Sequence, residues 1–187
     1  KESKLPFVEL SKIAELANSQ RLNNAAYYTN PELSFNVVNN APEFKDKNII
    51  HILEPSVGVG NFLPSLFQKY TKQEVCLDVI DIDKDSIKTL KYLLRKLKIP
   101  KNFKINFINE DFILFKNKKM YDLVIGNPPF EILNKKRINI YCRENLYLNS
   151  SAKNLYSFFL TKALRISKNI SFISPKALLE SKTFLED

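Results

Sequence analysis

The sequence predicts an α/β fold with a doubly wound, mostly parallel sheet, and two observations support this prediction. Continuous apolar runs alternate with amphipathic segments of about 10 to 15 residues, which is typical of buried strands joined by helices. All three glycines of the 187-residue chain follow such runs, Gly58 and Gly60 after one and Gly126 after another. Because glycine loses the most conformational entropy on folding, its restriction to two turns indicates a backbone requirement or a close ligand there.

The elements can be assigned in chain order. Apolar residues at helical spacing predict a helix over residues 7–19, and Pro31 in a first turn favours another over 31–40. Continuous apolar runs predict strands at 49–53, 75–82, 104–108, 123–125 and 170–173. Further helices are predicted at 61–70, at the apolar stripe 87–97 that Pro100 ends, and at 155–166.

The composition limits the classes of protein that fit. With 44% hydrophobic and 12% aromatic residues, the chain is expected to form one domain around one core. No apolar run reaches the roughly 20 residues of a membrane span, which predicts a soluble protein without a membrane partner. Cys76 and Cys142 lie far apart, so reduced thiols in a cytoplasmic protein are favoured over a disulfide. Two cysteines and one histidine argue against a zinc cluster.

The net charge of +9 has two explanations. Clustered cations bind the phosphates of nucleic acids, but abundant lysine, asparagine and isoleucine also result from translation of an AT-rich genome. Lys135, Lys136, Arg137 and Arg143 follow Gly126 closely. A solvated polar loop is the simpler interpretation of this segment, and a phosphate-contacting loop is the alternative.

The first glycine turn has the features of a ligand-binding turn. The segment Glu54-Pro55-Ser56-Val57-Gly58-Val59-Gly60-Asn61-Phe62 directly follows a predicted buried strand. Glycines here allow ligand atoms to approach the backbone, and the amides of the next helix would point at them. The third glycine of the dinucleotide fingerprint is missing, which argues against nicotinamide and flavin cofactors.

A carboxylate pair follows the second predicted strand, in the segment Asp81-Ile82-Asp83. At the end of such a strand, a carboxylate can accept hydrogen bonds from both hydroxyls of a ribose. This position favours a ribose-bearing ligand. The alternative is that Asp81 and Asp83 only cap the helix that begins near Asp85.

The second glycine turn, Gly126-Asn127-Pro128-Pro129-Phe130, is more specific. Two consecutive prolines fix the backbone and remove two donors, which leaves the nearby carbonyls and the Asn127 amide as preorganised polar groups. An amide oxygen and a backbone carbonyl can accept both hydrogens of an exocyclic amino group, with Phe130 stacked on the attached base. The alternative is a rigid turn without chemistry.

These two turns, in this order, resemble the S-adenosylmethionine motif and the catalytic motif of DNA adenine-N6 methyltransferases. The resemblance covers nearly the whole chain, and the other segments that carry it are Tyr27-Tyr28-Thr29, Asn109-Glu110-Asp111-Phe112, Leu155-Tyr156-Ser157-Phe158-Phe159 and Ile173-Ser174-Pro175. The Tyr-Tyr-Thr segment precedes the glycine turn, as in the subclass whose target-recognition domain comes last. Such proteins are typically modification enzymes of bacterial restriction systems, with a Rossmann-like methyltransferase fold.

The resemblance implies a role for each motif residue. The implied cofactor-binding residues are Tyr28, Thr29, Glu54, Pro55, Gly58, Gly60, Asp81, Ile82, Asp111 and Phe112, and the implied catalytic residues are Asn127, Pro128, Pro129 and Phe130. Glu54 and the two glycines would surround the methionine part of S-adenosylmethionine, and Thr29 would lie near its carboxylate. Asp81 would bind the ribose. Ile82 and Phe112 would enclose the adenine, whose amino group would donate to Asp111.

The implied reaction is methyl transfer to the N6 amino group of an adenine in double-stranded DNA. Asn127 and the Pro128 carbonyl would free the lone pair of that nitrogen, after which transfer depends on alignment. The adenine must leave the duplex to enter the pocket. Two alternatives remain open: the same chemistry on ribosomal RNA or on a release-factor glutamine, and a non-catalytic cofactor-binding subunit. An N4-cytosine target is a variant of the main interpretation.

The expected domain organisation also follows from the resemblance. Residues 1–46 would form an N-terminal helical cap that carries the Tyr-Tyr-Thr motif, in one structural unit with an S-adenosylmethionine-binding catalytic domain at 47–187. The family continues after its fifth strand with further strands and a recognition domain, whereas this sequence ends at Asp187. We therefore expect a sheet truncated after the fifth strand, without a target-recognition domain. Activity on DNA would need a C-terminal domain or a companion subunit.

Overall fold

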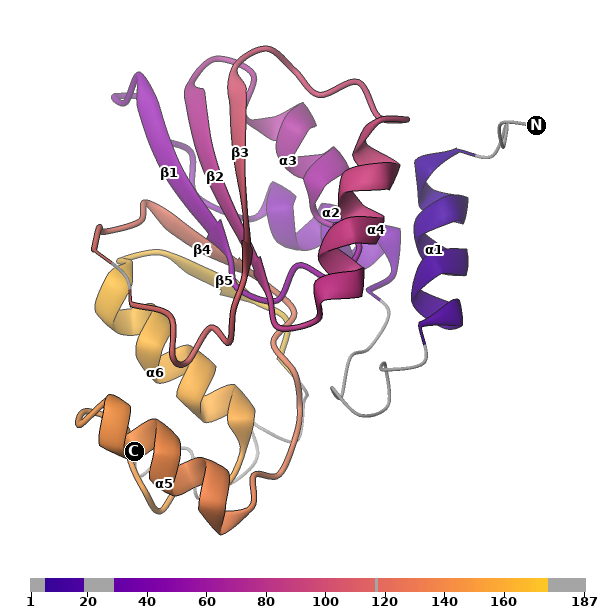
Figure 1. The fold of residues 1–187 in the computed structure, drawn as a ribbon. Helices are drawn as coiled ribbons and strands as arrows, with labels where there is room; N and C mark the ends of the chain where they lie inside the picture. Colours follow the sequence, from indigo (N-terminus) through magenta and orange to yellow (C-terminus); the bar gives the residue numbers. More distant parts are fainter. Residues whose placement is uncertain (1–5, 19–28, 117, 175–187) are drawn as a thin grey trace.

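The computed structural model describes residues 6–18, 29–116 and 118–174, and its centre is one five-stranded sheet (Figure 1). The strands are β1 (Ile49–Glu54), β2 (Glu74–Asp81), β3 (Phe103–Asn109), β4 (Leu123–Gly126) and β5 (Ile170–Phe172). Their order in the sheet is β3-β2-β1-β4-β5, and every pairing is parallel. The predicted doubly wound parallel sheet is therefore confirmed.

Helices cover both faces of this sheet. The helices are α1 (Phe7–Ala17), α2 (Pro31–Asn39), α3 (Leu63–Lys69), α4 (Lys84–Leu94), α5 (Lys135–Glu144) and α6 (Leu155–Ile166). In Figure 1, α2, α3 and α4 lie on one face, α1 lies outside α4, and α6 and α5 lie on the opposite side. Because β1 and β4 are the neighbours at which the strand order reverses, the crevice at their carboxyl ends is the expected ligand site.

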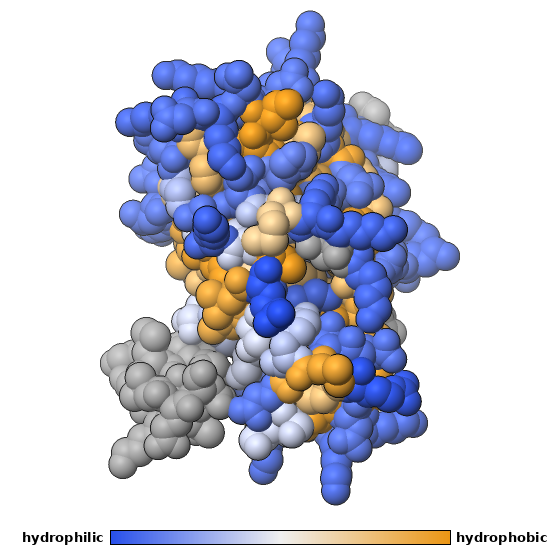
Figure 2. Space-filling model, turned by 90° about the vertical axis from the view of Figure 1, so that its left-hand side faces the viewer, coloured by the Kyte–Doolittle hydropathy of each residue, from blue (hydrophilic) through white to orange (hydrophobic). Residues whose placement is uncertain are grey.

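Two apolar cores result from this arrangement, one on each side of the sheet. On β1, Ile50 and Ile52 join the core beneath α2, α3 and α4, whereas Leu53 joins the core beneath α6. All three side chains are fully buried, which explains why β1 has a continuous apolar sequence rather than an alternating one. The face of the molecule shown in Figure 2 is predominantly hydrophilic, with apolar residues in separate groups.

The predicted elements agree with the observed ones to within a few residues, with one exception. The segment after the Asn-Pro-Pro-Phe turn is the helix α5, not the predicted solvated loop. Its helical signals are the cap Asn134, whose side chain accepts from the amide of Arg137, and the buried pair Ile138 and Tyr141. The dense charge of this segment concealed its narrow apolar stripe.

Some residues of the predicted motifs cannot be compared with the structure. Tyr27, Tyr28 and Pro175 lie outside the described residues. No helix in the described part of the chain combines the length and the apolar character needed to cross a membrane.

Candidate active site

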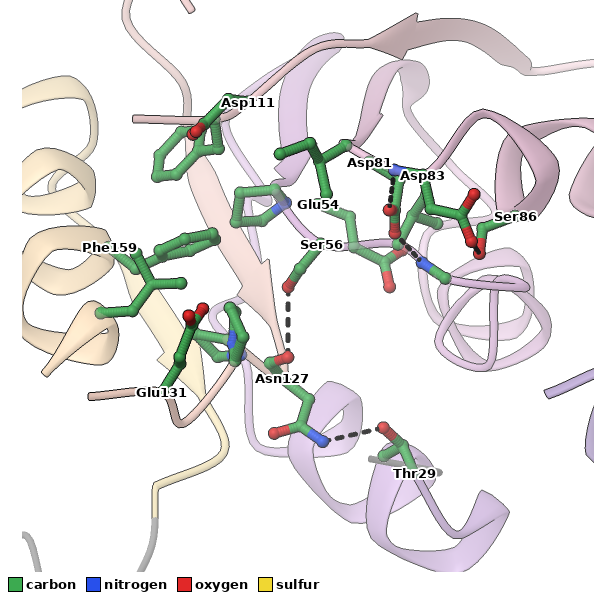
Figure 3. A pocket seen from close by; sticks show the side chains of 18 of the residues that line it. Thr29, Glu54, Ser56, Asp81, Asp83, Ser86, Asp111, Asn127, Glu131 and Phe159 are labelled. Atoms are coloured by element: carbon green, nitrogen blue, oxygen red, sulfur yellow. Dashed lines mark hydrogen bonds between the residues drawn. The ribbon is translucent and has the colours of Figure 1, made fainter. Parts of the chain in front are cut away.

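The two glycine turns meet at one cavity, as the sequence predicted. One follows β1 and the other follows the adjacent strand β4. The Ser56 hydroxyl donates to the backbone carbonyl of Asn127 at 3.1 Å and thereby joins the two turns (Figure 3). The described lining residues surround an open cavity, whose empty volume of about 1150 Å³ includes open solvent.

Most of the predicted site residues line this cavity. They are Thr29, Glu54, Pro55, Gly58, Asp81, Ile82, Asp111, Phe112, Asn127, Pro128 and Pro129. Of the predicted site residues that the structure describes, two are absent from the lining. Gly60 lies within the turn, and the ring of Phe130 stacks on Tyr156 with centroids 5.5 Å apart. The binding roles of all these residues remain predictions.

The glycine turn shapes the cavity through its backbone conformation. Gly58 has a φ of +54° and Gly60 a φ of +86°, a region that other residues rarely adopt. A Cβ on Gly60 would lie only 2.5 Å from Cδ1 of Leu90. The amides of Gly58 and Gly60 both donate within the protein, to Asp81 and to the Val57 carbonyl. The turn therefore brings its backbone close to the cavity, while the amides of these two glycines are used within the protein.

The carboxylates after β2 have structural partners. Asp83 caps α4 by accepting from the amide of Asp85, as the capping alternative predicted. The two oxygens of Asp81 accept from the amides of Gly58 and Asp83, both at 2.8 Å. Burial nevertheless raises the pKa of Asp81 to about 6. Asp81 thus holds the turn while it remains part of the cavity wall, where the predicted ribose contact would be made.

Glu54 is the most buried carboxylate of the cavity, with 1% of its surface exposed. Its Oε2 atom accepts no hydrogen bond from any described residue. Burial raises the pKa of Glu54 well above its ordinary value, and the negative charges of Asp81 and Glu15 raise it further. Burying a carboxylate without a donor or a counter-charge is unfavourable. A ligand that brings a cation or a hydrogen-bond donor to this point would reduce that cost.

Asn127, on the other side of the cavity, also has a buried acceptor atom that a ligand could satisfy. Its Nδ2 donates to the hydroxyl of the buried Thr29 at 3.1 Å, which fixes the orientation of the amide (Figure 3). The opposite atom, Oδ1, is buried and receives no hydrogen bond from the described residues. A buried acceptor without a donor is costly, so the site is suited to a ligand that brings an N–H group.

The acidic turn that contains Asp111 is held from two directions. Asp111 accepts from the amide of Ile113 and from the hydroxyl of Tyr141 on α5, at 2.8 and 2.7 Å. From α6, the buried ammonium of Lys162 donates to the carbonyls of Phe112 and Ile113, and also to that of Phe115. Burial lowers the pKa of Lys162 to about 8, so the ammonium form predominates at neutral pH.

Sequence reasoning missed several lining residues, because helices distant in sequence supply them. α5 contributes Arg137 and Tyr141, and Arg137 joins Tyr141 to Glu131 at 2.9 and 2.6 Å. From the α1 region come Glu15 and Asn18. No motif marks these positions, although a polar residue on the inward side of an amphipathic helix is a general signal.

The lining of the cavity is strongly acidic. The described lining residues with ionisable carboxyl or basic side chains are Glu15, Glu54, Asp81, Asp83, Asp111, Glu131 and Arg137. The single cation among them forms an ion pair with Glu131 at 2.6 Å. The cavity therefore favours a ligand with positive charge.

The five-stranded parallel sheet, with helices on both faces and a cavity at the carboxyl ends of β1 and β4, is the Rossmann-like fold of S-adenosylmethionine-dependent methyltransferases. The chain belongs to the Eco57I restriction-modification methylase family, whose model matches residues 64–186. It is 32% identical over 147 residues to the type II methyltransferase M.HincII of Haemophilus influenzae, over 74% of this chain and 25% of that protein. It is 28% identical over 137 residues to the modification methylase CviBIII of Paramecium bursaria Chlorella virus NC1A, over 71% of this chain and 33% of that protein. The chain thus spans a quarter to a third of these relatives.

Solved structures show the same fold. A Listeria monocytogenes protein assigned to the class I S-adenosylmethionine-dependent methyltransferases has a TM-score of 0.66 and 16% identity, over 98% of this chain and 58% of that one. The methyltransferase subunit of a type I restriction-modification system from Streptococcus thermophilus has a TM-score of 0.60 and 13% identity, over 76% of this chain and 32% of that one.

S-adenosylmethionine is the cofactor, and the cavity residues fit it. Its sulfonium and ammonium groups are positive, which matches the acidic lining. The buried Oε2 of Glu54, which no described residue satisfies, would gain a donor or a cation. Glu54, Asp81, Asp111 and Thr29 are the side chains that would hold the cofactor, which supplies an activated methyl group when bound.

Proposed function

We propose that this chain is the catalytic module of a DNA methyltransferase that transfers a methyl group to the N6 amino group of a flipped-out adenine. The observation that carries this proposal is the orientation of Asn127. Thr29 holds the nitrogen end of the amide, so the oxygen end is a buried acceptor to which no described residue donates. An exocyclic amino group is the type of donor that this oxygen lacks.

The proposed chemistry requires no strong base. The lone pair of an adenine amino nitrogen is delocalised into the ring, which makes the nitrogen a poor nucleophile. Two acceptors, Asn127 Oδ1 and the Pro128 carbonyl, would hold both N–H groups and favour a pyramidal nitrogen with an available lone pair. The prolines at 128 and 129 restrict the backbone, so these acceptors are positioned before the base arrives.

Base stacking would complete the target site. Phe130 stacks on Tyr156 at an interplanar angle of 25°, and Tyr156 in turn meets the edge of Phe172 at 6.2 Å. Tyr156 is 5% exposed, so this support is part of the core beside the sheet. A ring fixed in this way can stack on an extruded base with little loss of side-chain entropy. We propose that Phe130 does so, outside the cavity that holds the cofactor.

The test is methyl transfer by the full-length gene product, with labelled S-adenosylmethionine and with DNA or RNA as acceptor. After digestion to nucleosides, we expect label in N6-methyladenine from DNA. Label in N4-methylcytosine, or only in RNA, would contradict the proposed acceptor.

The variant Asn127→Ala tests the residue itself. We expect a loss of at least about 100-fold in kcat, the usual effect of removing one preorganised hydrogen-bonding group. The dissociation constant for the cofactor, measured by calorimetry, should change less than about twofold. Asn36→Ala makes the same change at an exposed position on α2 and should leave both quantities unaltered. Equal loss of cofactor binding and transfer in Asn127→Ala would indicate a structural role instead.

A further inference from the structure

Helix α5 connects two parts of the cavity that are far apart in sequence. Four lining residues form a continuous hydrogen-bonded series, in the order Glu131, Arg137, Tyr141 and Asp111. Arg137 lies 2.6 Å from Oε1 of Glu131 and 2.9 Å from the hydroxyl of Tyr141. That hydroxyl lies 2.7 Å from Oδ2 of Asp111. Because Glu131 directly follows the Asn-Pro-Pro-Phe turn and Asp111 follows β3, the series joins the turns after two different strands.

The direction of each hydrogen bond in this series follows from the chemistry of the groups. A guanidinium group only donates, so the oxygen of Tyr141 accepts from Arg137 and its single proton is given to Asp111. Burial raises the pKa of Tyr141 to about 12, and the hydrogen bond to Asp111 adds to this effect. The hydroxyl therefore keeps its proton at neutral pH. Tyr141 is thus a donor to Asp111 under all conditions in which the protein would act.

The other end of the series is anchored to the start of α6. The backbone carbonyl of Glu131 accepts from the amide of Leu155 at 2.8 Å. Arg137 and Tyr141 lie one turn apart on α5 and hence on the same face of that helix. Tyr141 is 3% exposed, so its ring is fixed by packing as well as by hydrogen bonds. The position of its hydroxyl is therefore determined by two helices.

Tyr141 determines how the carboxylate of Asp111 is oriented. Oδ1 of Asp111 accepts from the amide of Ile113 at 2.8 Å, and Oδ2 accepts from Tyr141. A carboxylate that is held at both oxygens cannot rotate freely. An ionised carboxylate accepts about four hydrogen bonds, so this one can still receive a donor from a ligand. Without the hydroxyl of Tyr141, only the Ile113 amide would orient the group.

The surroundings of Asp111 suit a planar base that carries an amino group. The rings of Phe112 and Phe159 both line the cavity, and their centroids are 4.9 Å apart. In Figure 3, Asp111 and Phe159 lie on the side of the cavity away from Asp81 and Asp83. The planar part of S-adenosylmethionine is its adenine, whose exocyclic amino group is a hydrogen-bond donor. Aromatic walls beside an oriented acceptor match that part of the cofactor.

We propose that Tyr141 is a positioning residue for cofactor recognition, which orients Asp111 toward the amino group of the cofactor's adenine. Arg137 holds Tyr141 in place from the side of the Asn-Pro-Pro-Phe turn. This inference rests on the proposed function, since it takes Asp111 as a residue that holds the cofactor. Selectivity for adenine over other purines then depends on α5, although α5 itself does not touch the amino group.

Calorimetry with two ligands tests the proposal. They are S-adenosylhomocysteine and its analogue with unsubstituted purine in place of adenine, which differ only in the amino group. The unaltered protein should bind S-adenosylhomocysteine about tenfold more tightly, the usual order for a hydrogen bond to a charged group. Tyr141→Phe should weaken S-adenosylhomocysteine at least about threefold, because the acceptor is no longer oriented. The affinity for the purine analogue should change less than about twofold.

A matched control is available at a second buried tyrosine. Tyr121 is also 3% exposed and donates to the carboxylate of Asp78 at 2.6 Å, but neither residue is among those that line the cavity. Tyr121→Phe therefore removes the same kind of hydrogen bond and should leave the preference for S-adenosylhomocysteine unchanged. If it lowers that preference as much as Tyr141→Phe does, the effect reflects reduced stability of the fold and the proposal is overturned.

The role of Arg137 is tested through Tyr141. Arg137→Lys keeps the charge, but one ammonium cannot replace the planar fork between Glu131 and the hydroxyl. We expect it to lower the preference for S-adenosylhomocysteine by itself and to add nothing to Tyr141→Phe, because it acts through the missing hydroxyl. Additive losses in the double variant would overturn this assignment of Arg137.

The remaining outcomes separate the proposal from the proposed function. An unchanged preference in Tyr141→Phe, or equal weakening of both ligands, would overturn the positioning role. Equal binding of both ligands by the unaltered protein would also overturn it, since Asp111 would then not recognise the amino group. Failure of the unaltered protein to bind either ligand would instead contradict the proposed function itself.

Discussion

The lining of the cavity and the chain as a whole have opposite charge. The whole chain has 29 Lys and Arg residues against 20 Asp and Glu, whereas the described lining has six carboxylates and the single cation Arg137. The excess of positive charge therefore lies away from the cavity. A cationic cofactor is attracted to the interior, and a polyanion such as DNA is attracted only to the exterior.

This contrast in charge predicts separate binding regions for the two ligands, the cavity for the cofactor and the exterior for DNA. Phosphates that approached the cavity would meet carboxylates, so under the proposed function a DNA backbone would stay at the rim while an uncharged base entered. The carboxylates in turn are held by the turns and helices around them, as Asp81 is by the amides of Gly58 and Asp83. Substitutions of the residues that hold these carboxylates should mainly weaken cofactor binding. Substitutions of exterior lysines should mainly weaken DNA binding.

The largest effect is expected for Lys162, the buried cation behind the acidic cavity. Lys162→Met keeps much of the volume but leaves three carbonyls, those of Phe112, Ile113 and Phe115, without their donor. We expect the free energy of unfolding to fall by about 3 kcal/mol, since the carbonyls remain buried. Urea denaturation measures this change, and calorimetry should show weaker cofactor binding because Asp111 lies on the same turn.

The control for this variant is Lys116→Met, which removes an exposed lysine from the end of the same turn. Lys116 pairs with Glu144 at 3.4 Å, and its side chain is 68% exposed. Such pairs contribute at most about 1 kcal/mol, so little change is expected. If Lys162→Met is no more destabilising than Lys116→Met, the acidic turn does not depend on the buried ammonium.

The next largest effect is expected at Gly60. Gly60→Ala places a Cβ 2.5 Å from Leu90 Cδ1 at a φ of +86°, which combines a steric clash with an unfavourable backbone conformation. We expect a loss of about 2 kcal/mol in unfolding free energy. Cofactor affinity should fall as well, while DNA affinity should remain unchanged.

Gly126→Ala is the matched comparison for this substitution. Its Cβ would lie 3.6 Å from Pro55 Cδ, an ordinary contact, and Gly126 has no positive φ. We expect less than about 1 kcal/mol of destabilisation. Equal effects of the two variants would show that strain in the first glycine turn does not shape the cavity.

The sequence was most informative where chemistry and backbone geometry coincide. Gly58, Gly60 and Gly126 stand where neighbouring parallel strands end, so their position predicted both the sheet and the place where the turns meet. Asp83 was more ambiguous, because a carboxylate after a strand is suited to a ribose and to a helix cap alike. Only the distance to the Asp85 amide, 2.9 Å, identifies the cap.

The missed features depend on contacts between segments far apart in sequence. Glu15 reaches Asn61 only because α1 packs against α4, and no local pattern encodes that packing. Similarly, Arg137 looked like one more cation of a charged loop, yet its guanidinium turns inward to Glu131 and Tyr141. Charge patterning predicts that a residue is ionised, but the partner that it finds is a property of the fold.

The proposed attraction of DNA to the positively charged exterior can be tested at the start of α5. Lys135 and Lys136 are exposed and follow the Asn-Pro-Pro-Phe turn closely, which fits the phosphate-contacting alternative. Replacing both with Glu should weaken DNA binding on the order of tenfold at low salt, because two cations become anions. Fluorescence anisotropy with a labelled duplex measures this, and cofactor affinity should not change.

The control places the same charge change away from the cavity. Lys98 and Lys101 are exposed and precede β3, at the amino-terminal edge of the sheet. Replacing both with Glu alters the net charge equally but leaves the rim of the cavity intact. If both double variants weaken DNA binding to the same degree, net charge rather than position determines DNA affinity.

The smallest expected effect is a pH dependence. Acidification should have opposite effects on cofactor affinity and on the stability of the protein without cofactor. The folded-state pKa of Asp81 is about 6, above the roughly 3.9 of an unfolded aspartate, because burial disfavours its charge. Between these values the folded state binds more protons, so acidification through this window stabilises the empty protein by way of this group. A cationic cofactor has the opposite preference, for ionised Asp81. Its affinity should fall about fourfold between pH 7.5 and 5.5 if only the ionised form binds. Calorimetry in buffers of different ionisation enthalpy should show proton release on binding near pH 6, and the absence of release would mean that Asp81 does not sense the charge of the cofactor.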